Sequence, residues 1–176
     1  EAVGKLVHLI RRYEPEVMII YDPIGGYGHP DHINVHRVGL AAYYMVRDLG
    51  RFPLEEGERE WAPRKLYWSA WARSRVRAFA EQRHRAGMIS DEDYDRMRHG
   101  GYPDEDIHAW ISVERFWEQK ERAWKAHRTQ IPEDWFMFQV PAEQRPQVFG
   151  AEAFVRVASR DLVCHDPEDD LFAGLR

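Results

Sequence analysis

A short apolar run followed by a glycine-rich loop and a helix start constrains the fold of this chain most. The run Glu16–Tyr21 is almost uninterrupted and is bounded by the turn residues Asp22-Pro23. Such a run is typical of a strand buried on both faces, as in a parallel sheet. Three of the four residues at 25–28 are glycine, and glycine lets the backbone turn sharply and approach a ligand closely.

Helices are predicted on both sides of this strand. Before it, apolar residues recur with a helical period at Val3, Leu6, Val7 and Ile10, and Glu14-Pro15 ends that helix. After the loop, a helix is predicted from Pro30 or Asp31 to about Leu49, closed by Gly50. Proline suits the first helical position, and an acidic residue in the first turn complements the helix dipole. Helix, strand and helix in this order indicate an α/β architecture.

The remaining elements extend this architecture. Strands are predicted over 65–70, 107–113 and 154–157, and helices over 73–85, after Ser90 and over about 114–128. The polar segment 52–63 lies in the crossover between the first two strands, and a crossover of this kind joins parallel strands. We therefore expect a Rossmann-like, mostly parallel sheet flanked by helices.

Three segments allow more specific expectations. The aromatic row of helix 114–128 and the arginines of 73–85 are interpreted as core and as a solvated face, respectively. The aromatic patch Trp135–Phe138 is interpreted either as a pocket lid or as a subunit contact. Residues 166–170 are predicted to be a solvated tail.

The start of the second helix carries a concentration of histidine and carboxylate. Three histidines and one aspartate occur within eight residues, at His29, Asp31, His32 and His36. Each has a structural interpretation, as a cap, a loop residue or one face of a helix. Their clustering favours a site instead, because open α/β sheets bind ligands outside the carboxyl ends of their strands. Imidazole and carboxylate are ligands that zinc prefers.

The spacing of His32 and His36 also suits a helical zinc site with two histidines. The metalloprotease form of that site requires a glutamate directly after the first histidine, and this chain has Ile33 there. The metalloprotease interpretation is therefore poor, and a bound metal must recruit ligands from elsewhere in the protein.

Composition limits the class of partner. The chain has 176 residues, of which 44% are hydrophobic and 31% charged, as expected for one globular domain. No apolar run approaches the roughly 20 residues of a membrane span, and no signal peptide is visible. A net charge of −5 argues against a nucleic-acid partner. The single cysteine, Cys164, excludes an internal disulfide and fits the reducing cytoplasm, where we expect the protein to act.

The glycine loop and helix start resemble a known family. The stretch Tyr21-Asp-Pro-x-Gly-Gly-Tyr-Gly-His-Pro-Asp-His32 is similar to the second motif of the LmbE-like (PIG-L type) zinc deacetylases. It most closely resembles the mycothiol branch, which contains the N-acetylglucosaminyl-inositol deacetylase and the mycothiol S-conjugate amidase. Further similarity lies at 65–68, 126–130 and 170–174, whereas 73–102 matches weakly.

The resemblance implies a role for each matching residue. His32 matches the third zinc ligand of the family, and His29 matches the histidine that acts as general acid and helps stabilise the oxyanion. Asp31 matches the carboxylate that orients this histidine, and Tyr27 matches a mobile tyrosine at the rim of the active site. Gln130 matches a glutamine near the sugar or inositol pocket. For His36 the resemblance supplies no ligand role, so we expect it to pack or to support the site.

The resemblance also implies a cofactor and a substrate class. The cofactor is Zn²⁺, with another divalent metal such as Fe²⁺ as the alternative, and the substrate is a small amino sugar or thiol conjugate. The family's first motif, Ala-His-Pro-Asp-Asp-Glu, supplies two further zinc ligands and the general base, but does not occur in this chain. We therefore expect residues 1–176 to be the C-terminal part of a single domain whose first strands are missing, and to be inactive alone.

Two alternatives stay open. The chain fits a metal-free α/β binding or structural domain as well, because a fold does not dictate function. Within the hydrolase hypothesis, Gly28 favours the deacetylase, whereas the segment 51–67 favours the conjugate amidase. Other N-acetyl sugars also remain as substrates.

Overall fold

A four-stranded sheet organises the chain. The computed structural model describes residues 1–160 and 164–175. Its strands are β1 (Val17–Ile20), β2 (Lys65–Ala70), β3 (Ala109–Ser112) and β4 (Ala151–Ser159), in the spatial order β1-β2-β4-β3. β1 and β2 run parallel, as their crossover predicts, and β4 is antiparallel to both β2 and β3. The α/β class is therefore confirmed, whereas this sheet is mixed and its expected mostly parallel character is not confirmed.

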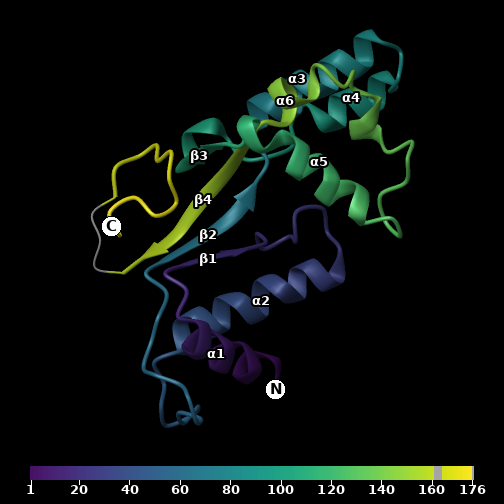
Figure 1. The fold of residues 1–176 in the computed structure, drawn as a ribbon. Coiled ribbons are helices and arrows are strands. Elements are labelled where there is room, and N and C mark those ends of the chain that lie inside the picture. Colours follow the sequence, from purple (N-terminus) through teal and green to yellow (C-terminus); the bar gives the residue numbers. More distant parts are fainter. Residues whose placement is uncertain (161–163, 176) are drawn as a thin grey trace.

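Two helices cover the β1 end of the sheet. α1 (Ala2–Tyr13) packs on α2 (Pro30–Met45), and α2 lies between α1 and β1 (Figure 1). Val7 and Ile10 of α1 meet Ala42 and Val46 in one apolar cluster. On the other side of α2, Gly39 lies so close to β1 that an added Cβ would stand 2.7 Å from Cγ2 of Ile20. The absence of a side chain at Gly39 thus sets how closely the helix approaches the strand.

The second helix ends earlier than the sequence predicts. It stops at Met45, not near Leu49. The guanidinium of Arg11 donates to the Val46 carbonyl through Nε at 3.0 Å and Nη2 at 2.7 Å. This side chain from α1 satisfies a carbonyl at the end of the helix, and the chain turns away.

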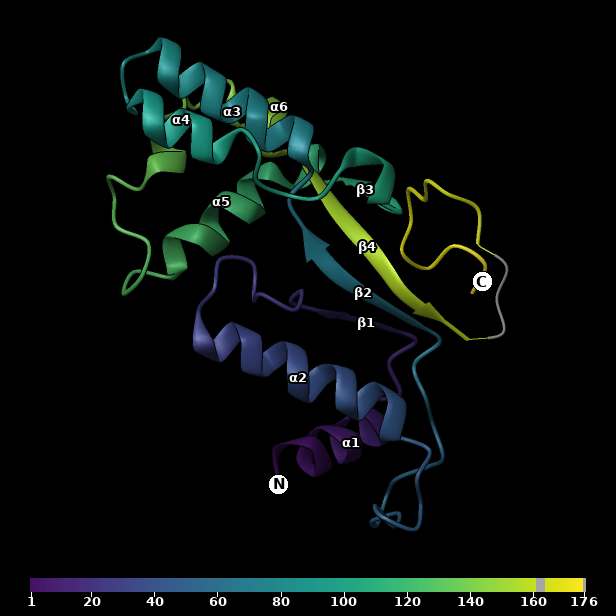
Figure 2. The same cartoon turned by 180° about the vertical axis from the view of Figure 1, so that it is seen from behind.

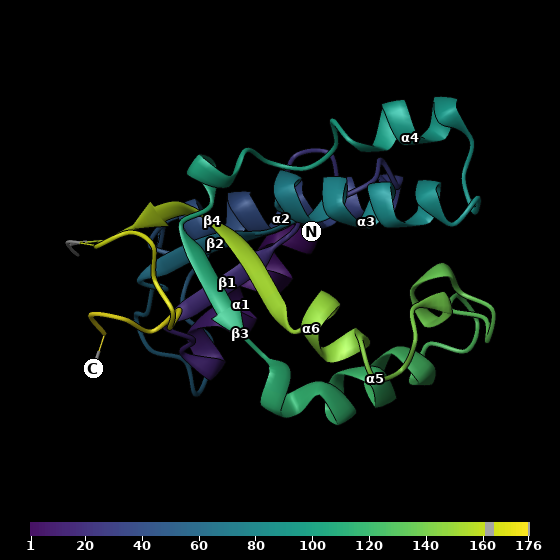
Figure 3. The same ribbon diagram turned by 90° about the horizontal axis from the view of Figure 1, so that it is seen from above.

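The remaining helices form a second part beyond the sheet, visible around the ends of β2 and β4 in Figure 3. They are α3 (Arg73–Arg85), α4 (Asp91–Met97), α5 (Trp117–Ala126) and α6 (Arg145–Phe149), with single 3₁₀ turns at Asp104–Asp106, Glu114–Phe116 and Phe136–Gln139. Ser90 caps α4 as expected, since its Oγ accepts the Asp93 N–H at 3.1 Å. None of the described helices is long and apolar enough to cross a bilayer.

An aromatic cluster holds this second part together. Its buried members are Trp117, Met137, Val140 and Phe149. The ring centroids of Trp124 and Trp135 lie 5.2 Å apart, so the patch at 135–138 packs inward against α5. Trp117 of α5 is core, as expected, and Met137 of the patch belongs to the same core, whereas Phe116 and Phe136 are exposed.

The prediction of a solvated tail at 166–170 is wrong at Glu168. Only 5% of this residue is exposed, and its carboxylate lies 2.6 Å from Nζ of Lys65 and 3.0 Å from Nη1 of Arg156. Its backbone also exchanges hydrogen bonds with β3 and the residue before it, through His108 O and Trp110 N. The tail therefore lies along β3 because its one inward carboxylate neutralises two cations of the sheet.

Candidate active site

The glycine loop connects the carboxyl end of β1 to the first turn of α2 (Figure 2). Gly25, Gly26 and Gly28 have φ values of 66°, 77° and 90°, in the left-handed region that favours glycine. At Gly25 an added Cβ would also stand 2.6 Å from the Cβ of His32. These glycines let the loop fold back over the start of α2.

His32 is fixed by this loop. Its Nδ1 lies 3.1 Å from the carbonyl oxygen of Gly25, and its ring stacks on Tyr21 with centroids 4.1 Å apart. A carbonyl at Nδ1 requires the proton there, so Nε2 is left as the acceptor nitrogen of the ring. Within residues 1–160 and 164–175, no hydrogen bond involves that Nε2. Metal-binding imidazoles are oriented in this way, so His32 fits the role of a ligand.

His29 caps α2. Its Nδ1 accepts the backbone N–H of Asp31 at 3.2 Å, which places the proton of the neutral ring on Nε2. The Asp31 carboxylate lies 4.0 Å from the same Nδ1 and is not hydrogen-bonded to it.

The loop brings two of the predicted side chains, those of Tyr27 and His29, around His32. The ring centroid of His32 lies 5.1 Å from that of His29 and 5.0 Å from that of Tyr27. Tyr27 is 72% exposed, as befits a side chain at a rim. Tyr27, His29, Asp31 and His32 thus occupy one end of α2.

Gln130 and His36 lie apart from this group. Gln130 is exposed in the turn after α5 and, in the described part of the chain, makes no hydrogen bond to the glycine loop. Its substrate-binding role stays a prediction. His36 is buried, its Nδ1 donates to Tyr21 O at 3.0 Å, and its ring packs edge-on against Trp68. Through this hydrogen bond it fixes the backbone at Tyr21, just before the glycine loop.

Two residues that were not predicted as site residues, Asp22 and Tyr102, hold the glycine loop in place. Asp22 is 4% exposed; its Oδ1 accepts the Gly26 N–H at 2.7 Å and its Oδ2 accepts the Tyr102 hydroxyl at 3.1 Å. An aspartate just before a glycine turn is a recognisable signal, because Asx side chains bond to nearby backbone N–H groups. Tyr102 carries no such local signal, since it reaches the site across 80 residues of chain.

Among the described residues, the group whose ligand atoms lie close enough to share a metal ion is outside the histidine motif. Ligand atoms of His8, Glu55 and Glu58 lie within 4.8 Å of one another. However, Nδ1 of His8 faces Glu58 at 3.0 Å, while Nε2 faces Glu55 at 3.5 Å. The two ring nitrogens thus serve different carboxylates, and we assign the group to clamping the loop at 55–58 onto α1.

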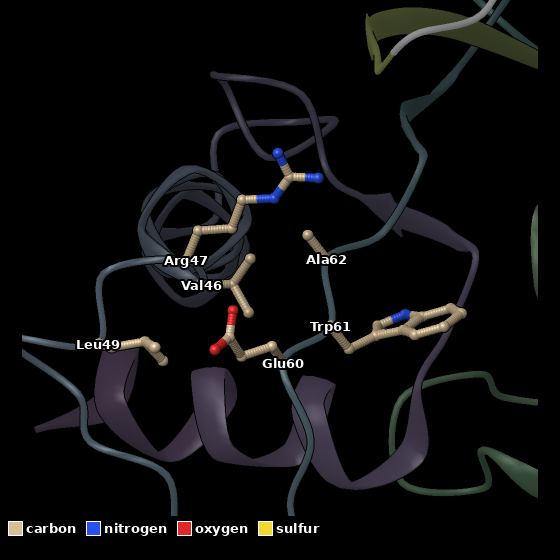
Figure 4. A pocket seen from close by; sticks show the side chains of 6 residues that line it. All are labelled: Val46, Arg47, Leu49, Glu60, Trp61 and Ala62. Atoms are coloured by element: carbon tan, nitrogen blue, oxygen red, sulfur yellow. The ribbon is translucent and has the colours of Figure 1, made fainter.

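A cavity of about 350 Å³ lies at the far end of α2 from the glycine loop (Figure 4). Its lining residues are Val46, Arg47, Leu49, Glu60, Trp61 and Ala62. No residue of the histidine motif lines it, so it is separate from the candidate active site.

Comparison with known proteins shows which enzymes this chain is similar to. No protein-family model matches it. It is 35% identical over 183 residues to the 1D-myo-inositol 2-acetamido-2-deoxy-alpha-D-glucopyranoside deacetylase of Salinispora arenicola, over 99% of this chain and 55% of that protein. The Mycothiol S-conjugate amidase of Streptomyces coelicolor is 32% identical over 179 residues, which cover 100% of this chain and 61% of the amidase. A deacetylase of Frankia alni is 36% identical, over 99% of this chain and 62% of the relative.

Fold and loop together define an α/β chain with a histidine-rich site at a strand's carboxyl end. Over nearly its whole length the chain is similar to these deacetylases and this amidase, which confirms its resemblance to the mycothiol branch of the LmbE-like family. It spans 55–62% of the length of these relatives.

Proposed function

We propose that the protein containing this chain hydrolyses an amide bond in an N-acetylglucosaminide or a mycothiol-type conjugate. The observation that carries the proposal is the orientation of His32, whose Nδ1 is held by Gly25 O while its ring lies 5.1 Å from that of His29. One imidazole is thereby prepared to bind a metal and the other to exchange a proton beside it. The names of the relatives support an amide substrate.

The donor set of the chain fits Zn²⁺, with Fe²⁺ as the alternative. His32 would hold the ion through Nε2. Bound zinc lowers the pKa of its water to about 7 and polarises a carbonyl oxygen. A catalytic zinc site usually has three protein ligands and a water, so the other ligands and the general base come from outside residues 1–176. The chain alone is therefore expected to be inactive.

The other residues of the loop act on the substrate. Amide cleavage needs a proton for the departing amine, and His29 supplies it, while Asp31, whose carboxylate lies 4.0 Å from Nδ1, orients the ring. Tyr27 contacts the substrate carbonyl or the developing oxyanion from the exposed rim, and Gln130 contributes to the sugar pocket. Each of these roles follows from the resemblance; Tyr27, His29 and Asp31 lie at the glycine loop and the start of α2, whereas Gln130 lies in the turn after α5.

The open edge of β1 is where the rest of the sheet would join. Among the described strands, β1 has β2 as its single neighbour, and Ile19 on it is 49% exposed. An unpaired strand edge presents free backbone groups to another strand. We propose that upstream strands pair here and complete a Rossmann-like, mostly parallel sheet, with residues 1–176 as the C-terminal part of one domain. The protein would act in the cytoplasm on a small molecule.

The test is acetate release by the full-length protein from an N-acetylglucosaminyl-inositol, beside cleavage of a mycothiol S-conjugate. His29→Gln is expected to lower kcat by about 10²–10⁴-fold, as the loss of a general acid does. His99→Gln, at an exposed histidine after α4, is the matched control and should leave kcat unchanged. Equal activity in both variants would contradict the role of His29. The faster of the two substrates decides between deacetylase and amidase.

A further inference from the structure

A hydrogen bond between the buried Asp22 and the half-buried Tyr102 joins the glycine loop to a distant part of the chain. Both carboxylate oxygens of Asp22 are used, one by the Gly26 N–H at 2.7 Å and the other by the Tyr102 hydroxyl at 3.1 Å. Gly26 directly precedes Tyr27, the first of the proposed active-site side chains. The position of the loop therefore depends on a carboxylate whose second partner lies outside the loop.

The backbone around Tyr102 is fixed on both sides. Its N–H donates to Trp71 O at 2.8 Å, and its carbonyl accepts from Arg73 N at 2.7 Å, so that it pairs with Ala72 as in a parallel ladder. Gly101, with φ 78°, allows this approach, since an added Cβ there would stand 2.4 Å from Trp71 O. The chain after α4 is thus docked at the end of β2, from where Tyr102 reaches the end of β1.

The hydrogen bond between Tyr102 and Asp22 persists over the pH range in which an enzyme works. Burial, with the neighbouring Asp22 carboxylate, raises the pKa of Tyr102 to about 12, so the phenol remains a proton donor over the working range of an enzyme. Asp22 is shielded from water, so loss of the hydroxyl would leave one of its oxygens without a partner. Such a loss costs more than an exposed hydrogen bond would.

We propose that Asp22 and Tyr102 are positioning residues, which fix the glycine loop so that Tyr27 and His29 face the reacting amide. The inference rests on the proposed function. The loop itself has no other described side chain that holds the Gly26 N–H, and the link ties its geometry to the segment between α4 and β3. Through Asp22, a tyrosine outside the loop determines where the proposed general acid stands.

Tyr102→Phe in the full-length protein tests this directly. Because His29 and Tyr27 act mainly in the transition state, kcat should fall by about 10–100-fold while KM changes little, as for other supporting residues around a site. Zinc content should stay at the wild-type level, since His32 is held by Gly25 and Tyr21. Tyr94→Phe, on α4 with its ring stacked on His84, is the matched control and should keep full kcat.

Two substitutions of Asp22 separate positioning from general destabilisation. Asparagine can still accept the Gly26 N–H through Oδ1 and donate to the Tyr102 oxygen, whereas alanine can do neither. Asp22→Asn should therefore retain most of the kcat that Asp22→Ala loses. Equal losses in the two variants would contradict the proposed link.

Amide hydrogen exchange of residues 21–29 gives a readout that does not need activity. In Tyr102→Phe the Gly26 amide should exchange faster, while the β2 amides keep their protection. Unchanged exchange, or faster exchange with unchanged kcat, would overturn the positioning role. A wild-type protein without hydrolase activity would instead contradict the proposed function, and the exchange result would then decide alone whether the link fixes the loop.

Discussion

At the scale of single residues, the buried charge of Glu168 makes the clearest stability prediction. Lys65 has no exposed surface, and Glu168 is its ion-pair partner at 2.6 Å. Removing one partner of a buried pair leaves the other charge uncompensated, which costs about 3–5 kcal/mol. We expect Glu168→Ala to lower the free energy of unfolding of the full-length protein by that amount in urea denaturation. The exposed neighbour Asp169 serves as control, and a similar loss in Asp169→Ala would refute the account.

The same residue predicts a dependence of stability on pH. Burial alone would raise the pKa of Glu168, but hydrogen bonds from Lys65 and Tyr67 and the charges of Lys65 and Arg156 outweigh it, so the pKa lies below 4.5. A lowered carboxyl pKa adds stability that is fully present above the unfolded value and is lost as the pH falls through the folded value. The difference in Tm between wild type and Glu168→Gln should shrink below about pH 4.5, and a constant difference would contradict this.

Residues differ in how far the neighbouring sequence predicts their contacts. Tyr27, His29, Asp31 and His32 lie within six positions of one another, so a local pattern was enough to predict them as a group. The Asp22–Tyr102 contact joins residues 80 positions apart and the Lys65–Glu168 contact joins residues 103 apart. Such contacts depend on which strands become neighbours, and no local pattern contains that information.

At the scale of elements, the approach of α2 to β1 depends on Gly39. A side chain there meets Ile20, whose Cγ2 would lie 2.7 Å from an added Cβ. Overpacking of this kind costs about 1–3 kcal/mol, so we expect Gly39→Val to lower Tm. The matched control is Gly50→Val, because Gly50 is exposed and an added Cβ meets nothing nearer than 3.5 Å. Equal effects at both positions would show that close helix packing is not the cause.

Element predictions succeeded where the signal was local. The strand at 65–70 and the helix at 73–85 coincide with β2 and α3, because the apolar run at 66–68 and the charged stretch at 73–85 mark these segments locally. The end of α2 was mispredicted, since Arg11 from another helix takes the Val46 carbonyl. Local propensity does not include a cap that tertiary structure supplies.

At the scale of the whole molecule, strand order escaped prediction. The sequence favoured a mostly parallel sheet, but β4 inserts antiparallel between β2 and β3 after the long excursion through the aromatic part. The pattern of apolar residues in a strand indicates which of its faces are buried. It does not indicate whether the strand runs parallel or antiparallel to its neighbours. Among the described strands β1 has β2 as its single neighbour, and we propose that the further strands of the sheet lie at this edge.

The measurement that tests the central claim most directly is the zinc content of the full-length protein, with acetate release measured on the same samples, beside His32→Ala. The account predicts about one zinc per chain and acetate release in the wild type, because a catalytic zinc needs its full set of ligands. His32→Ala should lose both. If the full-length protein binds no zinc or other divalent metal, the hydrolase proposal is wrong and the chain is part of a metal-free binding or structural domain.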